Sequence, residues 1–288
     1  MNFLYYAITI KYETIMRTYL KHFFPCLENR HVYPYRVVYP MMLEHVDFAP
    51  ITILYGNNGS GKSTLLNVLA RHLDLKKMTL GNDNGYFEGY VKKCSSSIDD
   101  EGLPEDSSFI RSEDIMVKIA RQRKLYAEIK KDVLSDNVLR DYGISKRLYE
   151  KALTDPESVK AADYALLSRY TAFQQARLAL GNNNEAFSNG ETALEYFKEH
   201  LFDESFYLLD EPENSMAPAF QQQLAQHIEL LARLDTQFVI ATHSPFLLAI
   251  PNAKIYDLDA RPSMERAWYE LENMKAYYRL FKQFEDRF

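Results

Sequence analysis

The stretch ITILYGNNGSGKST, residues 51–64, decides the fold of this chain. It runs from branched apolar residues into a segment, 56–61, that holds three of the chain's ten glycines, and then into Lys62. The next residues, KSTLLNVLARHL (62–73), place leucines at the spacing of one helix face. The sequence therefore predicts a β-strand, a glycine-rich loop and an α-helix in direct succession.

Residues 56–63 match the pattern G-x-x-x-x-G-K-[ST] of a phosphate-binding loop, in the strand-to-helix context that the pattern requires. Glycines allow positive φ angles and bring backbone N–H groups against phosphate oxygens, and the helix adds its positive N-terminal end. We expect Lys62 to reach the β- and γ-phosphates of ATP and the Ser63 hydroxyl to hold Mg²⁺. The residues expected to bind the nucleotide are Gly56, Asn57, Asn58, Gly59, Ser60, Gly61, Lys62, Ser63 and Thr64.

A pair of carboxylates follows a second apolar run, FYLLDE (206–211). A buried strand here would deliver both acids at its end. Asp210 is expected to bind the Mg²⁺ shell, and Glu211 to orient the attacking water or accept its proton. An acidic turn after a strand is common by itself, and it gains weight beside a phosphate-binding loop.

A histidine follows a third apolar run, QFVIATHSP (237–245). His243 could polarise the γ-phosphate or hold the attacking water, although a lone histidine is more often structural. The other histidines show no metal-ligand spacing, so no further metal site is predicted.

Strand patterns that alternate with helical patterns indicate an α/β core within a single domain, 1–288. Residues 80–108 collect glycine, serine, aspartate and proline, which predicts a flexible surface connection. Helical spacing with many charges predicts a helical lobe over 109–185. Apolar residues at helical spacing predict a C-terminal helical segment over 262–288.

Composition limits the classes of partner and compartment. The net charge of −6 gives no general attraction to nucleic acid or to an anionic membrane. Only Cys26 and Cys94 are present, without a CxxC pair, which favours a reducing, cytoplasmic location. No apolar run approaches the ~20 residues of a membrane span, so no membrane partner is expected. Met1 and Met16 are alternative translation starts.

Together, the loop, the acidic pair and the histidine resemble the ATP-binding-cassette (ABC) ATPases, specifically their SMC- and RecF-like branch, over residues 30–285. The resemblance implies a P-loop NTPase with an ABC-type mixed-sheet core and an inserted helical lobe. It also implies that His243 is the switch histidine and that ENSM (213–216) crosses a dimer interface. The stretch FIRSEDI (109–115) stands where the family often has a metal-coupling glutamine, but it contains none.

The segment FSNGE (187–191) stands where this family has its signature motif. The resemblance implies that Ser188, Gly190 and Glu191 of one protomer cap the ATP held by another. Ser188 and Glu191 also fit an S-x-x-E helix-capping box, and both interpretations can hold at once.

The predicted function is a Mg²⁺-dependent ATPase that forms a homodimer around ATP and acts in DNA repair, genome maintenance or phage defence. An effector protein or DNA is a candidate partner. The basic stretch KIARQRK (118–124) could bind phosphates, although a solvated helix face explains it more simply.

Two alternative functions stay open. One is an ABC transporter subunit, which usually has SGGQ where this chain has SNGE. The other is a nucleotide-gated interaction module with little turnover.

Overall fold

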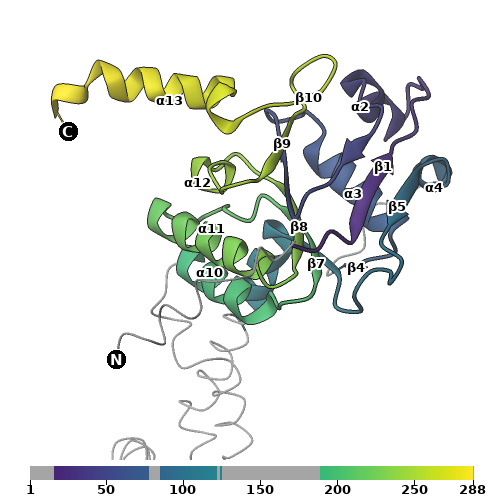
Figure 1. The fold of residues 1–288 in the computed structure, drawn as a ribbon, viewed down its shortest axis with the longest axis horizontal. Helices are drawn as coiled ribbons and strands as arrows, with labels where there is room; N and C mark the ends of the chain where they lie inside the picture. Colours follow the sequence, from purple (N-terminus) through teal and green to yellow (C-terminus); the bar gives the residue numbers. More distant parts are fainter. Residues whose placement is uncertain (1–15, 78–84, 122–123, 125–188, 288) are drawn as a thin grey trace, which may run out of the picture. The chain divides into compact units, whose positions relative to one another are not determined.

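The computed structural model describes residues 16–77, 85–121, 124 and 189–287 (Figure 1). The chain divides into two compact units, Met1–Ile115 with Ala193–Phe288, and Met116–Thr192. The architecture below is that of the first unit. Most of the lobe predicted over 109–185 lies outside the described residues, and its predicted start falls inside a strand of the first unit.

A seven-stranded sheet forms the centre of the first unit, in the order β10-β9-β3-β8-β7-β6-β4. All neighbouring pairs are parallel except β10 and β9. The strands are β3 (Ile51–Tyr55), β4 (Lys76–Lys77), β6 (Ser108–Arg111), β7 (Phe206–Asp210), β8 (Gln237–Ala241), β9 (Lys254–Asp257) and β10 (Met264–Glu265). The three strands predicted from apolar runs, β3, β7 and β8, are adjacent and buried along their whole length. The predicted α/β class with a mixed sheet is confirmed.

Helices cover both faces of this sheet (Figure 1). One face carries α3 (Lys62–His72), and the other carries α11 (Pro218–Ala232) and residues 193–200 of α10 (Asn189–His200). Helix α11 starts with proline at its first position, where the missing N–H removes no helical hydrogen bond. The short α12 (Pro245–Leu248) follows β8 and is capped by the Ser244 side chain.

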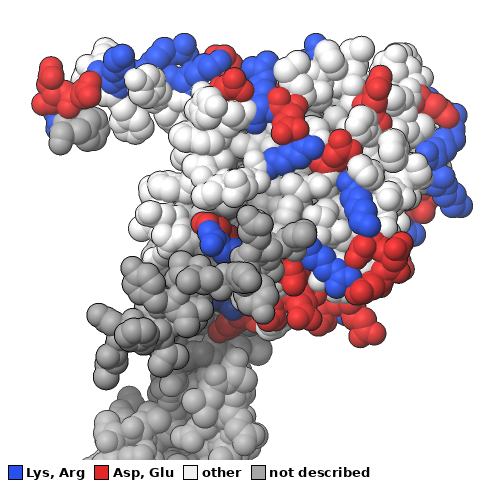
Figure 2. Space-filling view, in the orientation of Figure 1, with Lys and Arg blue, Asp and Glu red and all other residues white. Residues whose placement is uncertain are grey.

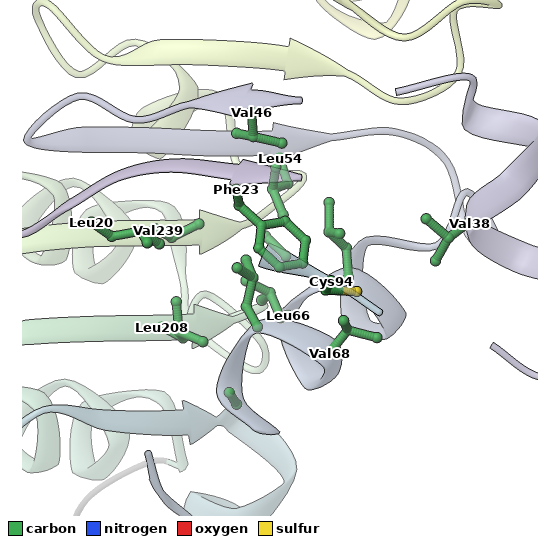
Figure 3. Packing of buried hydrophobic residues seen from close by; sticks show 14 of the residues in the cluster. Leu20, Phe23, Val38, Val46, Leu54, Leu66, Val68, Cys94, Leu208 and Val239 are labelled. Atoms are coloured by element: carbon green, nitrogen blue, oxygen red, sulfur yellow. The ribbon is translucent and has the colours of Figure 1, made fainter. Parts of the chain in front are cut away.

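A second, antiparallel sheet packs beyond α3, with the strand order β2-β1-β5. Its strands are β1 (Leu20–Phe24), β2 (Val46–Asp47) and β5 (Ser95–Ile98). Figure 3 shows Phe23 of this sheet beside Leu66 of α3 and Leu54 of β3, in the core that also holds Leu208 and Val239. Thus α3 is buried between the two sheets, which holds the loop before it in place.

The prediction of a flexible connection over 80–108 is wrong for the residues that the structure describes. Residues Gly85–Val91 form α4, which buries Phe87 and Tyr90, and Ser95–Ile98 form β5, which pairs with β1. The serine-rich sequence of β5 carries no strand signal. The strand is stabilised by its backbone hydrogen bonds to β1, which do not depend on the side chains. Residues 80–84 lie outside the described part.

The C-terminal segment is mainly helical, as predicted for 262–288, but it first adds strand β10 to the sheet. It continues through the 3₁₀-helix η3 (Trp268–Glu270) into α13 (Glu272–Gln283) and η4 (Glu285–Arg287). Ahead of β3, the short α2 (Tyr35–Val38) and η1 (Tyr39–Met41) pack on the start of α3. Among the described helices, none has the length and apolar character to cross a membrane.

Candidate functional site

The loop between β3 and α3 has a backbone that requires glycine at two points. Gly59 and Gly61 have φ angles of +84° and +101°, in the region that side chains disfavour. A Cβ on Gly61 would lie 2.1 Å from Met41 Cε and 2.9 Å from Val37 Cγ1. The segment at 35–41 therefore closes over the loop and leaves room for no side chain there.

Lys62, the first residue of α3, is buried and folds back into the loop. Its Nζ donates to the Gly56 carbonyl at 2.7 Å and lies 2.7 Å from Nε2 of His243. Because an ammonium group only donates, Nε2 accepts this bond, and the imidazole is neutral with its proton on Nδ1. Burial lowers the pKa of Lys62, and burial together with the Lys62 charge lowers the pKa of His243.

Ser63 and Asp210 meet at the carboxyl ends of the parallel strands. The Ser63 hydroxyl donates to Asp210 Oδ1 at 3.0 Å. These are hard oxygen donors of the kind that bind Mg²⁺ together with phosphate oxygens and water, so the pair fits this ion. No cluster of three or more histidine, cysteine, aspartate or glutamate side chains that could hold a metal ion occurs among the described residues. Burial, with a smaller contribution from the Glu211 charge, raises the pKa of Asp210 to about 6.

Glu211 lies beside His243, with 3.8 Å between Oε1 and Nε2. Its φ of 48° is left-handed, which is strained for a residue with a side chain. Its backbone N–H donates to the Ala241 carbonyl of β8 at 2.8 Å, which stabilises this conformation. Its other carboxylate oxygen accepts from Asn214, whose amide also donates to Ser112.

Glu213 was not predicted as a site residue, yet it joins the loop after β7 to the loop after β8. Its Oε1 accepts from the Thr242 hydroxyl at 2.6 Å, from the His243 N–H at 2.7 Å and from the Ser244 N–H at 3.1 Å. Burial raises its pKa, which these bonds oppose. The sequence signal was a second glutamate two residues after the acidic pair, at the end of a buried strand. Of the stretch ENSM (213–216), only Asn214 and Ser215 are exposed.

Asp259 is a second residue that the sequence prediction missed. It follows β9, and its Oδ2 accepts from the backbone N–H of Asn57 at 2.8 Å. It therefore tethers the start of the phosphate-binding loop to the neighbouring strand. The apolar run KIYDL (254–258) before it is the signal that could have revealed the strand.

Of the predicted signature residues, Ser188 lies outside the described residues, and Gly190 and Glu191 lie in the first turn of α10, in the second unit. Their role at a partner's nucleotide stays a prediction. At 109–115, Arg111 pairs in register with Asp210 of β7 and forms an ion pair with Asp114 at 2.9 Å. Arg111 and Ser112 therefore lie near the acidic pair at 210–211, in the stretch where the family often has a glutamine.

We expect Glu213→Ala to destabilise the protein and to lower activity. It would leave the Thr242 hydroxyl and the His243 N–H without an acceptor, at about 1–3 kcal/mol for each group that stays dry, whereas the Ser244 N–H keeps the Thr242 hydroxyl oxygen. Glu213→Gln keeps an acceptor oxygen and should lose less. Urea unfolding of both variants would measure the difference. Equal stability of the alanine variant and the parent would contradict this role.

The fold is that of an α/β P-loop NTPase with a mixed sheet, similar to an ATP-binding cassette. Residues 176–249 match the family model AAA_21, described as "AAA domain, putative AbiEii toxin, Type IV TA system". This match covers the strands that end in Asp210 and Ala241 and the histidine loop after them.

Curated relatives include ABC proteins from two organisms. The chain is 24% identical over 251 residues to an ATP-dependent lipid A-core flippase of Idiomarina loihiensis, covering 83% of this chain and 37% of the relative. It is 31% identical over 111 residues to ABC transporter G family member 12 of Dictyostelium discoideum, covering 37% of this chain and 17% of the relative. The chain thus spans well under half the length of these relatives.

Solved structures similar to the chain include a cassette from an ABC transporter and an Smc head domain. One is a nucleotide-free ATP-binding cassette from an ABC transporter, at 18% identity and a TM-score of 0.36, covering 75% of this chain and 81% of that one. Another is the Smc head domain of Pyrococcus furiosus bound to the C-terminal domain of ScpA, at 14% identity and a TM-score of 0.36, covering 82% and 94%.

Proposed function

We propose that the chain binds and hydrolyses ATP, with ADP and phosphate as products. One observation carries the proposal. Five polar side chains converge at one edge of the sheet, beside a loop whose backbone conformation suits phosphate binding: Lys62, Ser63, Asp210, Glu211 and His243. Each group suits one part of phosphoryl transfer to water.

The amides of residues 56–64 and Lys62 bind the phosphates in this proposal. In the structure, the ammonium group donates to the Gly56 carbonyl and to His243 Nε2. The triphosphate replaces these weaker acceptors with charged oxygens, which form stronger hydrogen bonds. Lys62 then leaves His243 Nε2, and the imidazole becomes available to the γ-phosphate or the attacking water.

Glu211 acts as the base in this proposal, and Ser63 with Asp210 would hold Mg²⁺. The ion, when bound, neutralises charge on the phosphates. Glu211 stands 3.8 Å from His243, so a water between phosphate and carboxylate could contact both side chains. Glu213 acts through the backbone of 242–244 and sets the position of His243, so it is a positioning residue.

We also propose that two copies close around two ATP molecules, with Ser188, Gly190 and Glu191 of one copy against the γ-phosphate of the other. The exposed Asn214 and Ser215, next to Glu211, would contact the second copy. Contacts to the γ-phosphate exist only with ATP, so ATP favours the closed pair and hydrolysis reopens it. By resemblance to the SMC- and RecF-like branch, we place this cycle in DNA repair, genome maintenance or phage defence.

A transporter subunit is the second candidate function, favoured by the match to a flippase over 83% of the chain. Phosphate release by the purified chain, measured with and without Mg²⁺, tests the ATPase proposal. Absence of release with retained ATP-dependent dimerisation would favour an interaction module. Co-purification of a membrane permease from the native host would favour the transporter.

We expect Asp210→Asn to abolish ATP hydrolysis and to stabilise the protein without ligands at pH 8. The pKa of Asp210 is about 6 in the folded protein against 3.8 ordinarily, so folding is penalised once the carboxyl ionises. This penalty is absent below pH 4, grows as pH rises to 6 and is then on the order of 3 kcal/mol. The variant should therefore gain stability at pH 8 and none at pH 4.

Urea unfolding in EDTA at both pH values measures this gain. Asp106→Asn, at an exposed position in the loop before β6, is the matched control and should change stability little at either pH. An Asp210→Asn variant that is no more stable than the parent at pH 8 would contradict the buried-anion explanation.

A further inference from the structure

A large apolar groove lies away from the phosphate-binding loop, between α11, α12 and α13. Its volume is about 810 Å³. Its lining is almost entirely uncharged and includes Ala225, Phe246, Ile250, Met274, Tyr277 and Phe281. Figure 2 shows it as a hollow beneath α13, bordered by uncharged surface. Monomeric soluble proteins rarely expose a contiguous apolar patch of this kind.

Helix α13 forms one wall of the groove, and its buried residues lie at its start. Leu271 and Met274 are buried, and every described residue from Ala276 onward is exposed. In Figure 1 the helix continues away from the central sheet. The fold of a single copy therefore leaves most of the helix surface in water.

The exposed part of α13 carries the anchor pattern of a helix that binds in a groove. Tyr277, Leu280, Phe281 and Phe284 stand at positions i, i+3, i+4 and i+7, and are between 41% and 55% exposed. This spacing places them on one face. The same patch thus contains an apolar ridge and an apolar groove, as a two-fold symmetric interface requires.

We propose that α13 of a second copy fills this groove, and that two chains form a dimer that needs no nucleotide. This nucleotide-independent dimer differs from the ATP-dependent closure proposed above, because it uses a different surface. The two α13 helices run antiparallel, and each places its aromatic stripe against α11 and α12 of the other copy.

The exposed apolar area supports a second copy as the occupant. Seven large apolar side chains of the segment are about half exposed: Trp268, Tyr269, Tyr277, Tyr278, Leu280, Phe281 and Phe284. Since a fully buried aromatic side chain covers ~150–250 Å², they leave on the order of 700 Å² to cover. A stable interface buries about 800 Å² on each partner, so mutual burial of this patch is sufficient in size.

The charges of α13 favour an antiparallel pair. Lys275, Arg279 and Lys282 make the middle of the helix basic, whereas Glu285 and Asp286 make its end acidic. Figure 2 shows the basic side chains along the outer edge of α13 and acidic ones at its end. Antiparallel helices that cross near Lys282 bring the acidic end of each copy toward the basic middle of the other, at the rim of the interface.

Sedimentation or light scattering of the full chain in EDTA without nucleotide tests the proposal. We expect the parent to have twice the 33.6 kDa mass of one chain, and Phe281→Glu to have the mass of one chain. Tyr86→Glu, at a similarly exposed aromatic residue of α4, is the matched control and should stay dimeric. Because Phe281 is half exposed in one copy, its replacement should leave the chain folded and able to bind ATP.

One further result separates this dimer from the ATP-dependent one. Lys62→Ala should remain dimeric in EDTA even if it binds no ATP. A monomeric parent, or a Phe281→Glu variant that stays dimeric, would overturn the proposal. Failure of ATP hydrolysis alone would leave it intact.

Discussion

Glu211→Gln is expected to lower the rate of ATP hydrolysis by about 10²–10⁴-fold while ATP still binds. Glutamine has the shape of glutamate and can still accept from Asn214, but it cannot take a proton from water. Since hydrolysis is the step proposed to open the ATP-bound pair, the variant should accumulate closed dimer with Mg²⁺ and ATP. Phosphate release and size-exclusion chromatography measure the two effects.

The closed pair must be separated from any dimer through α13. The experiment is therefore best done in the Phe281→Glu background, where only ATP-dependent association remains. Glu105→Gln, at an exposed glutamate outside the site, is the matched control and should hydrolyse ATP like the parent. A Glu211→Gln variant that binds ATP and stays monomeric in that background would rule out the ATP-sandwich model.

Lys62→Ala is expected to weaken ATP binding by roughly 10- to 150-fold, because a hydrogen bond from a charged group contributes about 1.5–3 kcal/mol. The loss should be smaller for AMP, which has no β- or γ-phosphate for the lysine to reach. Calorimetric titration with ATP, ADP and AMP would measure this dependence on phosphate number.

Lys76→Ala, at a lysine that is 71% exposed, is the matched control for the loss of one positive charge. It should leave affinity unchanged. A thermal melt of Lys62→Ala would check that the loop still folds, since the lysine also donates to the Gly56 carbonyl. Unchanged ATP affinity in a folded Lys62→Ala protein would remove the lysine from its proposed role.

Several parts of the fold and site could be predicted because their signals are local. Gly59 and Gly61 mark a backbone conformation that few other residues adopt, and the apolar runs before and after them indicate strand and helix. Asp210 and His243 each follow a buried apolar run. Carboxyl ends of parallel strands meet at one edge of a sheet, which explains why the structure brings these side chains near the loop.

Other parts could not be predicted because they depend on which strands become neighbours. The sequence by itself determined the strand, loop and helix at 51–73 and the polar side chains at the strand ends. Only the tertiary structure decided that Glu213 accepts from the loop after β8, and that Asp259 holds the N–H of Asn57, 202 positions away in the chain. The physical reason is that a glycine turn or an apolar run is stabilised within a few residues, whereas a buried carboxylate is stable only where folding supplies its donors.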